Sequence, residues 1–149
     1  MTDNRGFTLV ELISVVLILS VLALIVYPIY SNYIEKARIS AVRSALLENA
    51  YFMEKFYLQN GTFKQTSTKW PKLPIQEAEG FCIRLNGVAR GALDSKFMLK
   101  AVAIDKNKEP RIIKMNENLV TFVCEGSASS CDDGLDYFRG NDKGCTLFK

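Results

Sequence analysis

Four cysteines are the residues of this 149-residue chain with the most recognisable chemistry, and all of them lie in its C-terminal half. They stand at positions 82, 124, 131 and 145. A zinc site would need CxxC-type spacing or histidine partners, and the sequence contains no histidine. Two disulfides formed in an oxidising compartment are therefore favoured, with all three connectivities open at this point. We expect no metal ion and no cofactor.

The other groups that could carry catalysis are few. Histidine is absent as a general base, and the sequence has no glycine-rich phosphate loop. Asp132 and Asp133 are adjacent in a stretch rich in glycine and serine, where such pairs are usually solvated turn residues. Because the cysteines are expected to be paired, they are not available as nucleophiles. We interpret the chain as a protein that is not an enzyme.

Positive charge is concentrated in one part of the chain, although the net charge is only +3. Residues 84–114 contain eight basic and three acidic side chains, whereas residues 124–145 contain two basic and five acidic ones. Such a basic stretch is a solvated surface, a surface that pairs with acidic neighbours in an assembly, or a track for a nucleic-acid backbone. Composition leaves these three alternatives open.

An apolar run near the N-terminus predicts a membrane-spanning helix. Residues 7–30 read FTLVELISVVLILSVLALIVYPIY, and as a helix they would reach about 36 Å, against a bilayer core of about 30 Å. Arg5 precedes the run and the larger domain follows it, so the N-terminus is expected in the cytoplasm and the domain outside it. No small-residue cleavage site follows the run, so the segment should remain in the mature protein.

Glu11 is the only charged residue within this apolar run. A carboxylate deep in a bilayer costs about 2.5–3.5 kcal/mol, and less near the interface. Two interpretations stay open: an interfacial acid that complements the positive end of a helix, or a functional group that pairs with a cation. Cleavage after Gly6 would create such a cation, the new amino group of Phe7.

The run RGFTLVE at residues 5–11 resembles the class III signal of type IV prepilins, in which G-F-T-L-x-E precedes the hydrophobic helix. The resemblance implies cleavage between Gly6 and Phe7 by prepilin peptidase, N-methylation of Phe7, and pairing of Glu11 with the Phe7 amino group of a neighbouring subunit during assembly. It also implies an inner-membrane protein with its head in the periplasm, which later joins other pilin subunits in a type IV pilus through the assembly machinery. The expected parts are a leader (1–6), a transmembrane and filament-core helix (7–30) and a globular head (31–149) that includes the C-terminal half of the helix.

The pattern after Pro28 becomes amphipathic and stays helical, so Pro28 is expected to kink the helix rather than end it. One helix is predicted over Phe7–Leu58, ended by Asn60-Gly61. Its packed face is predicted to contain Ala41, Val42, Ala45, Leu46, Asn49, Phe52, Met53 and Phe56.

Alternating apolar residues after the helix predict four strands in an antiparallel meander. The strands are expected at 81–85, 96–104, 111–115 and 119–124, with a loop at 60–80 before them. The fold class is therefore α+β, and the resemblance implies the type IV pilin fold. In this fold a long N-terminal helix packs on a small antiparallel sheet, and residues 125–149 form a disulfide-stapled C-terminal loop region.

Strand alternation then places cations on the outer face of the sheet. If the apolar residues of each strand face the helix, the basic residues between them face outward. We predict a stripe across adjacent strands formed by Arg84, Lys100 and Lys114. Connections would extend it with Arg90, Lys106 and Lys108. Duplex DNA could lie along such a stripe, although like charges so close together are mildly destabilising.

Beyond its N-terminus, the chain resembles the minor pilins that act as DNA receptors in neisserial natural transformation. The resemblance is carried by residues 45–61, 80–104, 112–124 and 127–138 together with the four cysteines. It implies selective binding of double-stranded DNA uptake sequences by an electropositive surface, with sequence preference set by loops and by the C-terminal disulfide region. Arg90 and Ser129 are loop positions expected to alter that preference. The alternatives are a structural or adhesive minor pilin that binds no DNA, and a secretion pseudopilin.

The predicted strand order favours one disulfide connectivity. Cys82 opens the first strand and Cys131 lies on the loop that leaves the fourth, so we predict a Cys82–Cys131 bond. Cys124–Cys145 would then close the terminal loop.

Overall fold

A long helix, α1, runs from Leu9 to Asn60 in the computed structural model, which describes residues 8–148 and only the backbone of residues 28 and 29. Thr8 and Glu11 form a capping box at its start. The Glu11 carboxylate accepts the Thr8 N–H and hydroxyl, both at 3.0 Å, and the Thr8 hydroxyl accepts the Glu11 N–H at 3.3 Å. The helix is continuous through residue 28, as predicted, and Gly61 follows its end with a left-handed φ of 70°.

The chain divides into two compact units, Met1–Ala37 and Arg38–Lys149. In the first unit the large apolar side chains from Leu9 to Val26 are all exposed. This part of α1 is long and apolar enough to cross a membrane. A helix that is apolar on all sides is typical of a segment buried in lipid or among other helices.

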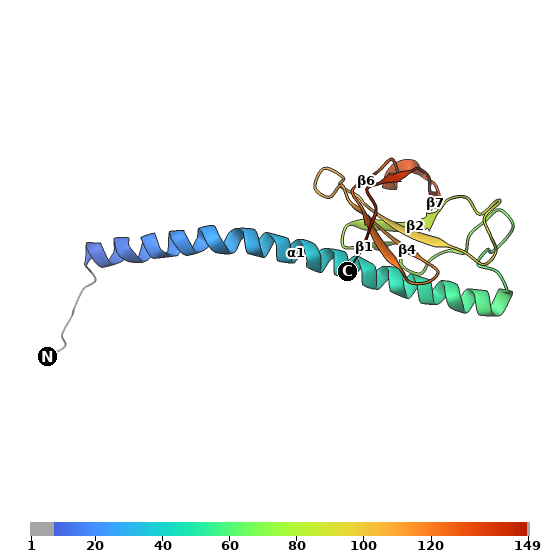
Figure 1. The fold of residues 1–149 in the computed structure, drawn as a ribbon, viewed down its shortest axis with the longest axis horizontal. Helices are drawn as coiled ribbons and strands as arrows, with labels where there is room; N and C mark the ends of the chain where they lie inside the picture. The colour runs from blue at the N-terminus through green and yellow to red at the C-terminus, as the bar shows by residue number, and fades with distance from the viewer. Residues whose placement is uncertain (1–7, 149) are drawn as a thin grey trace. The chain divides into compact units, whose positions relative to one another are not determined.

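The second unit contains a sheet that covers one side of the C-terminal part of α1 (Figure 1). Six of its strands follow the order β1-β2-β3-β4-β5-β9, and neighbours along this order pair antiparallel. They are β1 (Glu77–Ala78), β2 (Phe81–Asn86), β3 (Met98–Ala103), β4 (Ile112–Asn116), β5 (Thr121–Cys124) and β9 (Thr146–Leu147). The four predicted strands correspond to β2, β3, β4 and β5, so the predicted meander is confirmed.

The C-terminal segment (residues 125–148) is more ordered than predicted. It was expected to be a loop, but it holds a 3-10 turn and short strands. These are η1 (Cys131–Asp133), β6 (Gly126–Ser127), β7 (Tyr137–Phe138), β8 (Asp142–Lys143) and β9. β7 pairs parallel with β2, and β6 pairs with β8. Two-residue strands form through pairing with distant residues and leave no alternating pattern, so the sequence could not reveal them.

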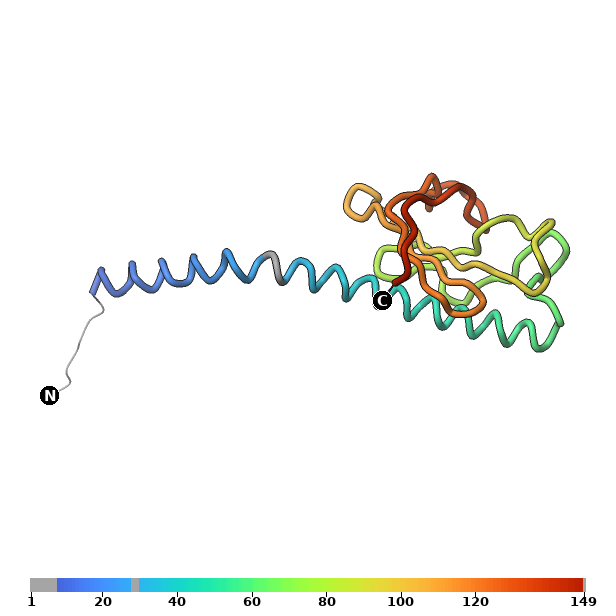
Figure 2. The backbone as a smooth tube through the Cα atoms, viewed as in Figure 1, coloured from blue at the N-terminus to red at the C-terminus, as the bar shows by residue number. Residues whose placement is uncertain are grey.

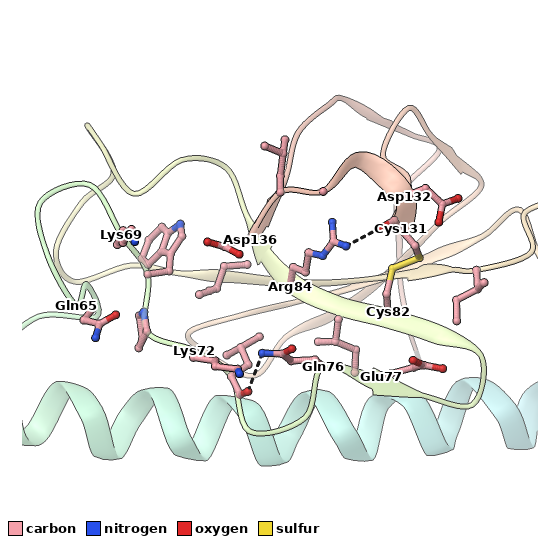
Figure 3. Close-up of a pocket in the computed structure, with 18 residues that line it drawn as sticks. Gln65, Lys69, Lys72, Gln76, Glu77, Cys82, Arg84, Cys131, Asp132 and Asp136 are labelled. Atoms are coloured by element: carbon pink, nitrogen blue, oxygen red, sulfur yellow. Dashed lines mark hydrogen bonds between the residues drawn. A yellow bond between two sulfur atoms is a disulfide. The ribbon is translucent and has the colours of Figure 1, made fainter.

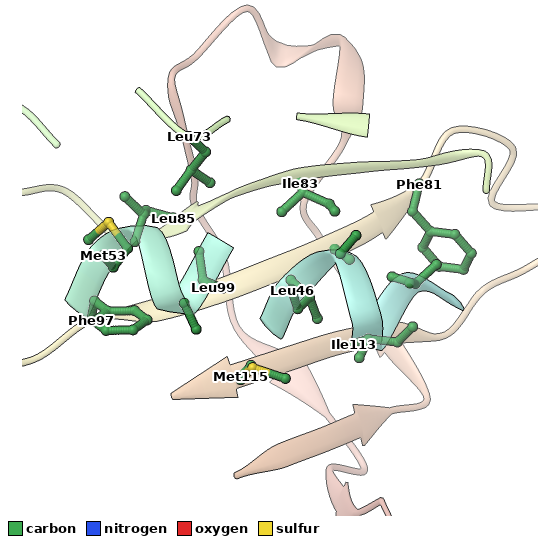
Figure 4. Packing of buried hydrophobic residues seen from close by; sticks show 14 of the residues in the cluster. Leu46, Met53, Leu73, Phe81, Ile83, Leu85, Phe97, Leu99, Ile113 and Met115 are labelled. Atoms are coloured by element: carbon green, nitrogen blue, oxygen red, sulfur yellow. The ribbon is translucent and has the colours of Figure 1, made fainter. Parts of the chain in front are cut away.

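The core of the second unit lies between α1 and the sheet (Figure 4). Leu46 and Met53 on the helix pack with Ile83, Leu99 and Ile113 on the strands, and all five side chains are fully buried. The predicted inward faces of the strands are therefore confirmed. The predicted helix face was too wide at one edge: Ala41 is exposed, because the face centred on residues 42, 46, 49 and 53 points at the sheet.

Asn49 ties the loop at residues 61–76 to the helix. Its side chain is fully buried, its amide nitrogen donates to the Ile75 carbonyl at 2.7 Å, and its amide oxygen accepts the Ile75 N–H at 3.0 Å. Both hydrogen-bonding groups of the buried amide are thus satisfied, as a buried polar side chain requires.

Two disulfides fix the C-terminal segment to the sheet. Cys82 bonds to Cys131, and Cys124 bonds to Cys145, which is the predicted connectivity. The first bond ties the start of β2 to η1, and the second joins the end of β5 to the residue before β9. The part of the segment before β9 lies on the side of the sheet away from α1, where Val102, Ile112 and Phe138 form a second small apolar cluster.

Candidate nucleic-acid interface

Arg84, Lys100 and Lys114 are direct cross-strand neighbours. Arg84 on β2 lies opposite Lys100 on β3, and Lys100 lies opposite Lys114 on β4. Their apolar neighbours along the strands face α1, so the three cations project from the other face of the sheet. The predicted alignment is confirmed.

The C-terminal segment covers this face, so the prediction that Lys100 meets solvent is wrong. Lys100 is fully buried. Its Nζ lies 2.5 Å from Oδ1 of Asp142, while Nζ of Lys114 lies 2.9 Å from Oδ2 of the same carboxylate. Alternation along a strand tells which face a side chain takes, but not whether another part of the chain covers that face. In this arrangement the Lys100 ammonium cannot reach a phosphate.

Two serines complete the surroundings of the Lys100 ammonium. It donates to Oγ of Ser127 at 3.0 Å and to Oγ of Ser129 at 2.7 Å, so with Asp142 it has three acceptors for its three N–H groups. Ser129 itself is only 2% exposed, and its hydroxyl donates to the Arg139 carbonyl. The Ser129 hydroxyl is therefore used inside the protein, and the prediction that this position alters sequence preference stays a prediction.

The buried charges of this network shift two pKa values. Burial alone would raise the pKa of Asp142, but hydrogen bonds from Lys100, Ser127 and Lys114 outweigh it and hold that pKa below its usual range. Burial lowers the pKa of Lys100, and the hydrogen bond and negative charge of Asp142 partly offset this effect. Because two lysines and a hydroxyl stabilise the carboxylate, Asp142 is ionised across the neutral range.

Arg84 is also partnered by the C-terminal segment, but less completely buried. Its Nη1 lies 2.5 Å from Oδ1 of Asp133, its Nη2 donates to the Cys131 carbonyl at 2.6 Å, and its guanidinium lies 5.0 Å from the ring centroid of Phe138. The side chain of Arg84 keeps 20% exposure and that of Lys114 keeps 17%. Only a small part of each of these two side chains is therefore accessible to a ligand from solution.

The other three predicted cations are exposed. Arg90 lies on the β2–β3 connection, and Lys106 and Lys108 lie on the β3–β4 connection. Lys108 pairs with Asp105 at 3.6 Å, yet 83% of its side chain is exposed. Because β2, β3 and β4 are antiparallel, the two connections lie at opposite ends of the sheet (Figure 2). The predicted stripe is thus mostly covered while its predicted extensions are exposed to solvent, and the six cations do not form one open surface.

Arg139 is an exposed cation outside the predicted stripe and its extensions. It follows β7, and its Nε and Nη2 donate to the Tyr137 hydroxyl at 3.1 and 2.6 Å, with the guanidinium 5.3 Å from the Tyr137 ring centroid. Its position was not predicted to be a DNA contact because residues 124–145 are acidic overall and no alternating pattern there predicted a strand. The closeness of a tyrosine and an arginine in YFRG was the one sequence feature that could have drawn attention to it.

A groove of about 770 Å³ runs along β2, between residues 65–77 and the C-terminal segment (Figure 3). Lys69 and Lys72 line the first side, while Asp132 and Asp136 line the second. The Trp70 indole, half-buried in this wall, donates to the Gly87 carbonyl at 2.9 Å. Since one wall is acidic, the groove is unsuited to a polyanion, and Trp70 anchors a loop instead of standing free to stack.

Comparison with known proteins agrees with this architecture. Residues 28–111 match the family described as type IV minor pilin ComP, DNA uptake sequence receptor, and residues 1–27 match the prokaryotic N-terminal methylation motif. The chain is 82% identical to the type IV pilin ComP from Neisseria meningitidis, covering 79% of this chain and 99% of that one, with a TM-score of 0.55. It is 54% identical to the minor DNA-uptake pilin ComP from Neisseria subflava, covering 74% and 95%, with a TM-score of 0.63.

A major fimbrial protein is also similar to this chain. The type IV major fimbrial protein FimA of Dichelobacter nodosus is 31% identical over 107 residues, which is 69% of each chain. The match to the receptor family spans more than half of the chain, and it includes β2, β3 and the connections that carry Arg90, Lys106 and Lys108. The chain therefore belongs to the family of the type IV minor pilin ComP, the DNA uptake sequence receptor.

Proposed function

We propose that this chain is a minor pilin that binds double-stranded DNA uptake sequences during natural transformation, without enzymatic activity. The observation that carries the proposal is the match of residues 28–111 to a family of DNA receptors. Solvent-exposed cations on connections within that region support it, because phosphate contacts supply most of the sequence-independent affinity for DNA.

Access divides the proposed phosphate contacts into two groups. Arg90, Lys106 and Lys108 are exposed and are proposed as the main contacts. Arg84 and Lys114 are proposed to contribute through their exposed edges, since each already has a carboxylate partner. This reverses the order of importance expected from strand alternation.

The N-terminal part is proposed to follow the pilin pathway. Cleavage by prepilin peptidase between Gly6 and Phe7 and N-methylation of Phe7 fall on residues outside the described range, and the methylation motif at residues 1–27 supports both. We propose a leader at 1–6, a membrane and filament helix at 7–30 and a head at 31–149. The head would lie in the periplasm while the helix sits in the inner membrane, and both would later enter the pilus with other pilin subunits.

Titration of DNA binding against salt tests the receptor proposal. The full chain in detergent is incubated with short duplexes at several salt concentrations, and Arg90→Gln, Lys106→Gln and Lys108→Gln are compared with wild type. Each lost phosphate contact should weaken binding to all duplexes and lower the slope of log affinity against log salt by about one.

Lys55→Gln is the matched control, because Lys55 is an equally exposed cation on α1, outside the proposed surface. It should leave the slope unchanged. If wild type binds no duplex even at low salt, the chain is a structural or adhesive pilin. If wild type binds but the three substitutions leave the slope unchanged, these residues are not the contacts.

A further inference from the structure

We propose that Arg139 contacts bases of the bound DNA and so determines which sequence is preferred. Ser129 holds the backbone of Arg139 in position from inside the protein. The proposal rests on the proposed function and names a contact residue outside the predicted stripe. Ser129 connects the buried ammonium of Lys100 to the backbone of the exposed Arg139.

The backbone of Arg139 is held from inside the protein. The Ser129 hydroxyl donates to the Arg139 carbonyl and accepts from the buried Nζ of Lys100 at 2.7 Å. Gly140, the next residue, has a φ of 114°, and a Cβ there would stand 3.3 Å from Cβ of Ala128. Residues 139–140 thus pass close against residues 128–129, and the position of Arg139 is fixed from the side of the sheet.

The side chain of Arg139 is held as well, by its own strand. Two of its N–H groups donate to the Tyr137 hydroxyl, which leaves three of the five donors of the guanidinium available. The side chain remains exposed, and within residues 8–148 no carboxylate forms an ion pair with it. Arg84, by contrast, already has Asp133 as its partner.

An arginine held at both its backbone and its side chain suits base recognition more than phosphate contact. A phosphate accepts almost any nearby cation, whereas bidentate recognition of guanine in the major groove needs a guanidinium in a set orientation. A contact residue supported by a buried polar network meets that requirement. Arg139 is therefore the specificity residue, and Ser129 is a positioning residue.

The test measures discrimination between two duplexes. The wild-type full chain in detergent selects a duplex from a randomised pool, and its affinity is compared with that for a shuffled duplex of equal composition. Arg139→Lys keeps the charge but loses the bidentate fork, so the ratio of the two affinities should fall about 5- to 150-fold while the salt slope stays the same. Lys143→Arg, a change at another exposed cation of the same segment, is the matched control and should leave the ratio unchanged.

A double-mutant comparison tests the role of Ser129. Ser129→Ala should reduce the ratio in the wild-type background and have no further effect in the Arg139→Lys background, because Ser129 acts only through Arg139. A general loss of structure would instead lower the affinity in both backgrounds.

The outcomes separate the two proposals. If wild type binds and selects a sequence but Arg139→Lys keeps the full ratio, the specificity role is wrong and the receptor function stands. Equal effects of Ser129→Ala in both backgrounds would overturn the positioning role. If wild type selects no sequence and binds no duplex, the receptor function itself fails.

Discussion

The ammonium of Lys100 illustrates how neighbours decide what a charged side chain does. It sits in the middle of three aligned cations, yet it is fully buried and bonded to Asp142, Ser127 and Ser129. A buried charge of this kind must be paired and fully hydrogen-bonded to be tolerated. Lys100 is therefore part of the support beneath the C-terminal segment, whereas Arg139 and Arg90 are exposed to solvent.

The charge of Asp142 should make the free energy of unfolding of the head depend on pH in the acid range. The pKa of Asp142 in the folded protein lies below the 3.8 of an unperturbed aspartate, so its charged form stabilises the fold above that pH. This contribution is lost as the pH falls from 3.8 through the lower pKa of the folded state. In urea unfolding at a series of pH values, Asp142→Asn should be less stable than wild type at neutral pH, and the difference should narrow below 3.8.

Other titrating groups contribute equally to the pH dependence of unfolding in Asp142→Asn and in wild type, so the difference between the two proteins reports on Asp142 alone. Glu109 also has a lowered pKa, chiefly because the Arg111 side chain donates hydrogen bonds to it, but this holds in both proteins. A difference in unfolding free energy that stays constant from neutral to acid pH would contradict the assigned role of the Asp142 charge.

At the scale of elements, the C-terminal segment covers the outer face of the sheet and also supplies two of its strands, β7 and β9. Its strands are two residues long, and β7 pairs with β2 while β9 pairs with β5. Two disulfides, Cys82–Cys131 and Cys124–Cys145, and ion pairs to Arg84, Lys100 and Lys114 attach it further. The sheet face beneath it would otherwise expose apolar residues and repelling cations. The segment thus covers apolar surface and neutralises charge at once.

Removing Cys124–Cys145 should loosen this layer while the sheet persists. The bond joins residues 21 positions apart, and removing a cross-link that closes a loop of this length lowers the free energy of unfolding by about 3 kcal/mol, because the unfolded chain gains conformational entropy. In the double variant Cys124→Ala and Cys145→Ala, we expect a lower unfolding midpoint and faster hydrogen exchange in residues 125–148. The amides of β3, in the middle of the sheet, should stay protected.

The variant Cys82→Ala with Cys131→Ala is the control for position. It releases η1 from β2, so its largest increase in exchange should fall around residues 128–136 instead. Equal loss of protection across β2, β3 and β4 in the first variant would mean that the segment and the sheet unfold together.

At the scale of the whole molecule, one helix serves two environments. Residues from Leu9 to Val26 carry exposed apolar side chains, whereas Val42, Leu46 and Met53 are buried in the head. The change follows the composition of the helix: apolar on all sides first, and amphipathic afterwards. A filament or a membrane is needed to cover the first part, while the head folds around the second.

Substitution of Glu11 should impair assembly into pili without affecting cleavage of the leader. In the free chain Glu11 caps the helix with Thr8, and glutamine can take the same capping position. Glu11→Gln therefore keeps the helix start but removes the charge proposed to pair with the Phe7 amino group of a neighbouring subunit. We expect mass spectrometry to find the leader removed and Phe7 methylated, and immunoblots of sheared pili to find little of the variant.

Thr8→Ser, which keeps both the charge of Glu11 and a capping hydroxyl, is the control and should enter pili as wild type does. Incorporation of Glu11→Gln at the wild-type level would rule out the proposed charge pairing.

The sequence by itself determined the helix, the four main strands, the inward face of the sheet and the alignment of Arg84, Lys100 and Lys114. The helix, the strands and the inward face follow from local periodicity, whereas the alignment of the three cations also needed the predicted pairing of successive strands in a meander. Connectivity of the cysteines also followed, because strand order limited which of them could meet.

Only the tertiary structure decided which cations are available. Lys100 meets Asp142 across 42 residues and Arg84 meets Asp133 across 49, and no local pattern records such contacts. Whether a sheet face is open or covered depends on where a distant, irregular segment comes to rest. For that reason Lys100 and Ser129 are buried, whereas Arg139 is exposed.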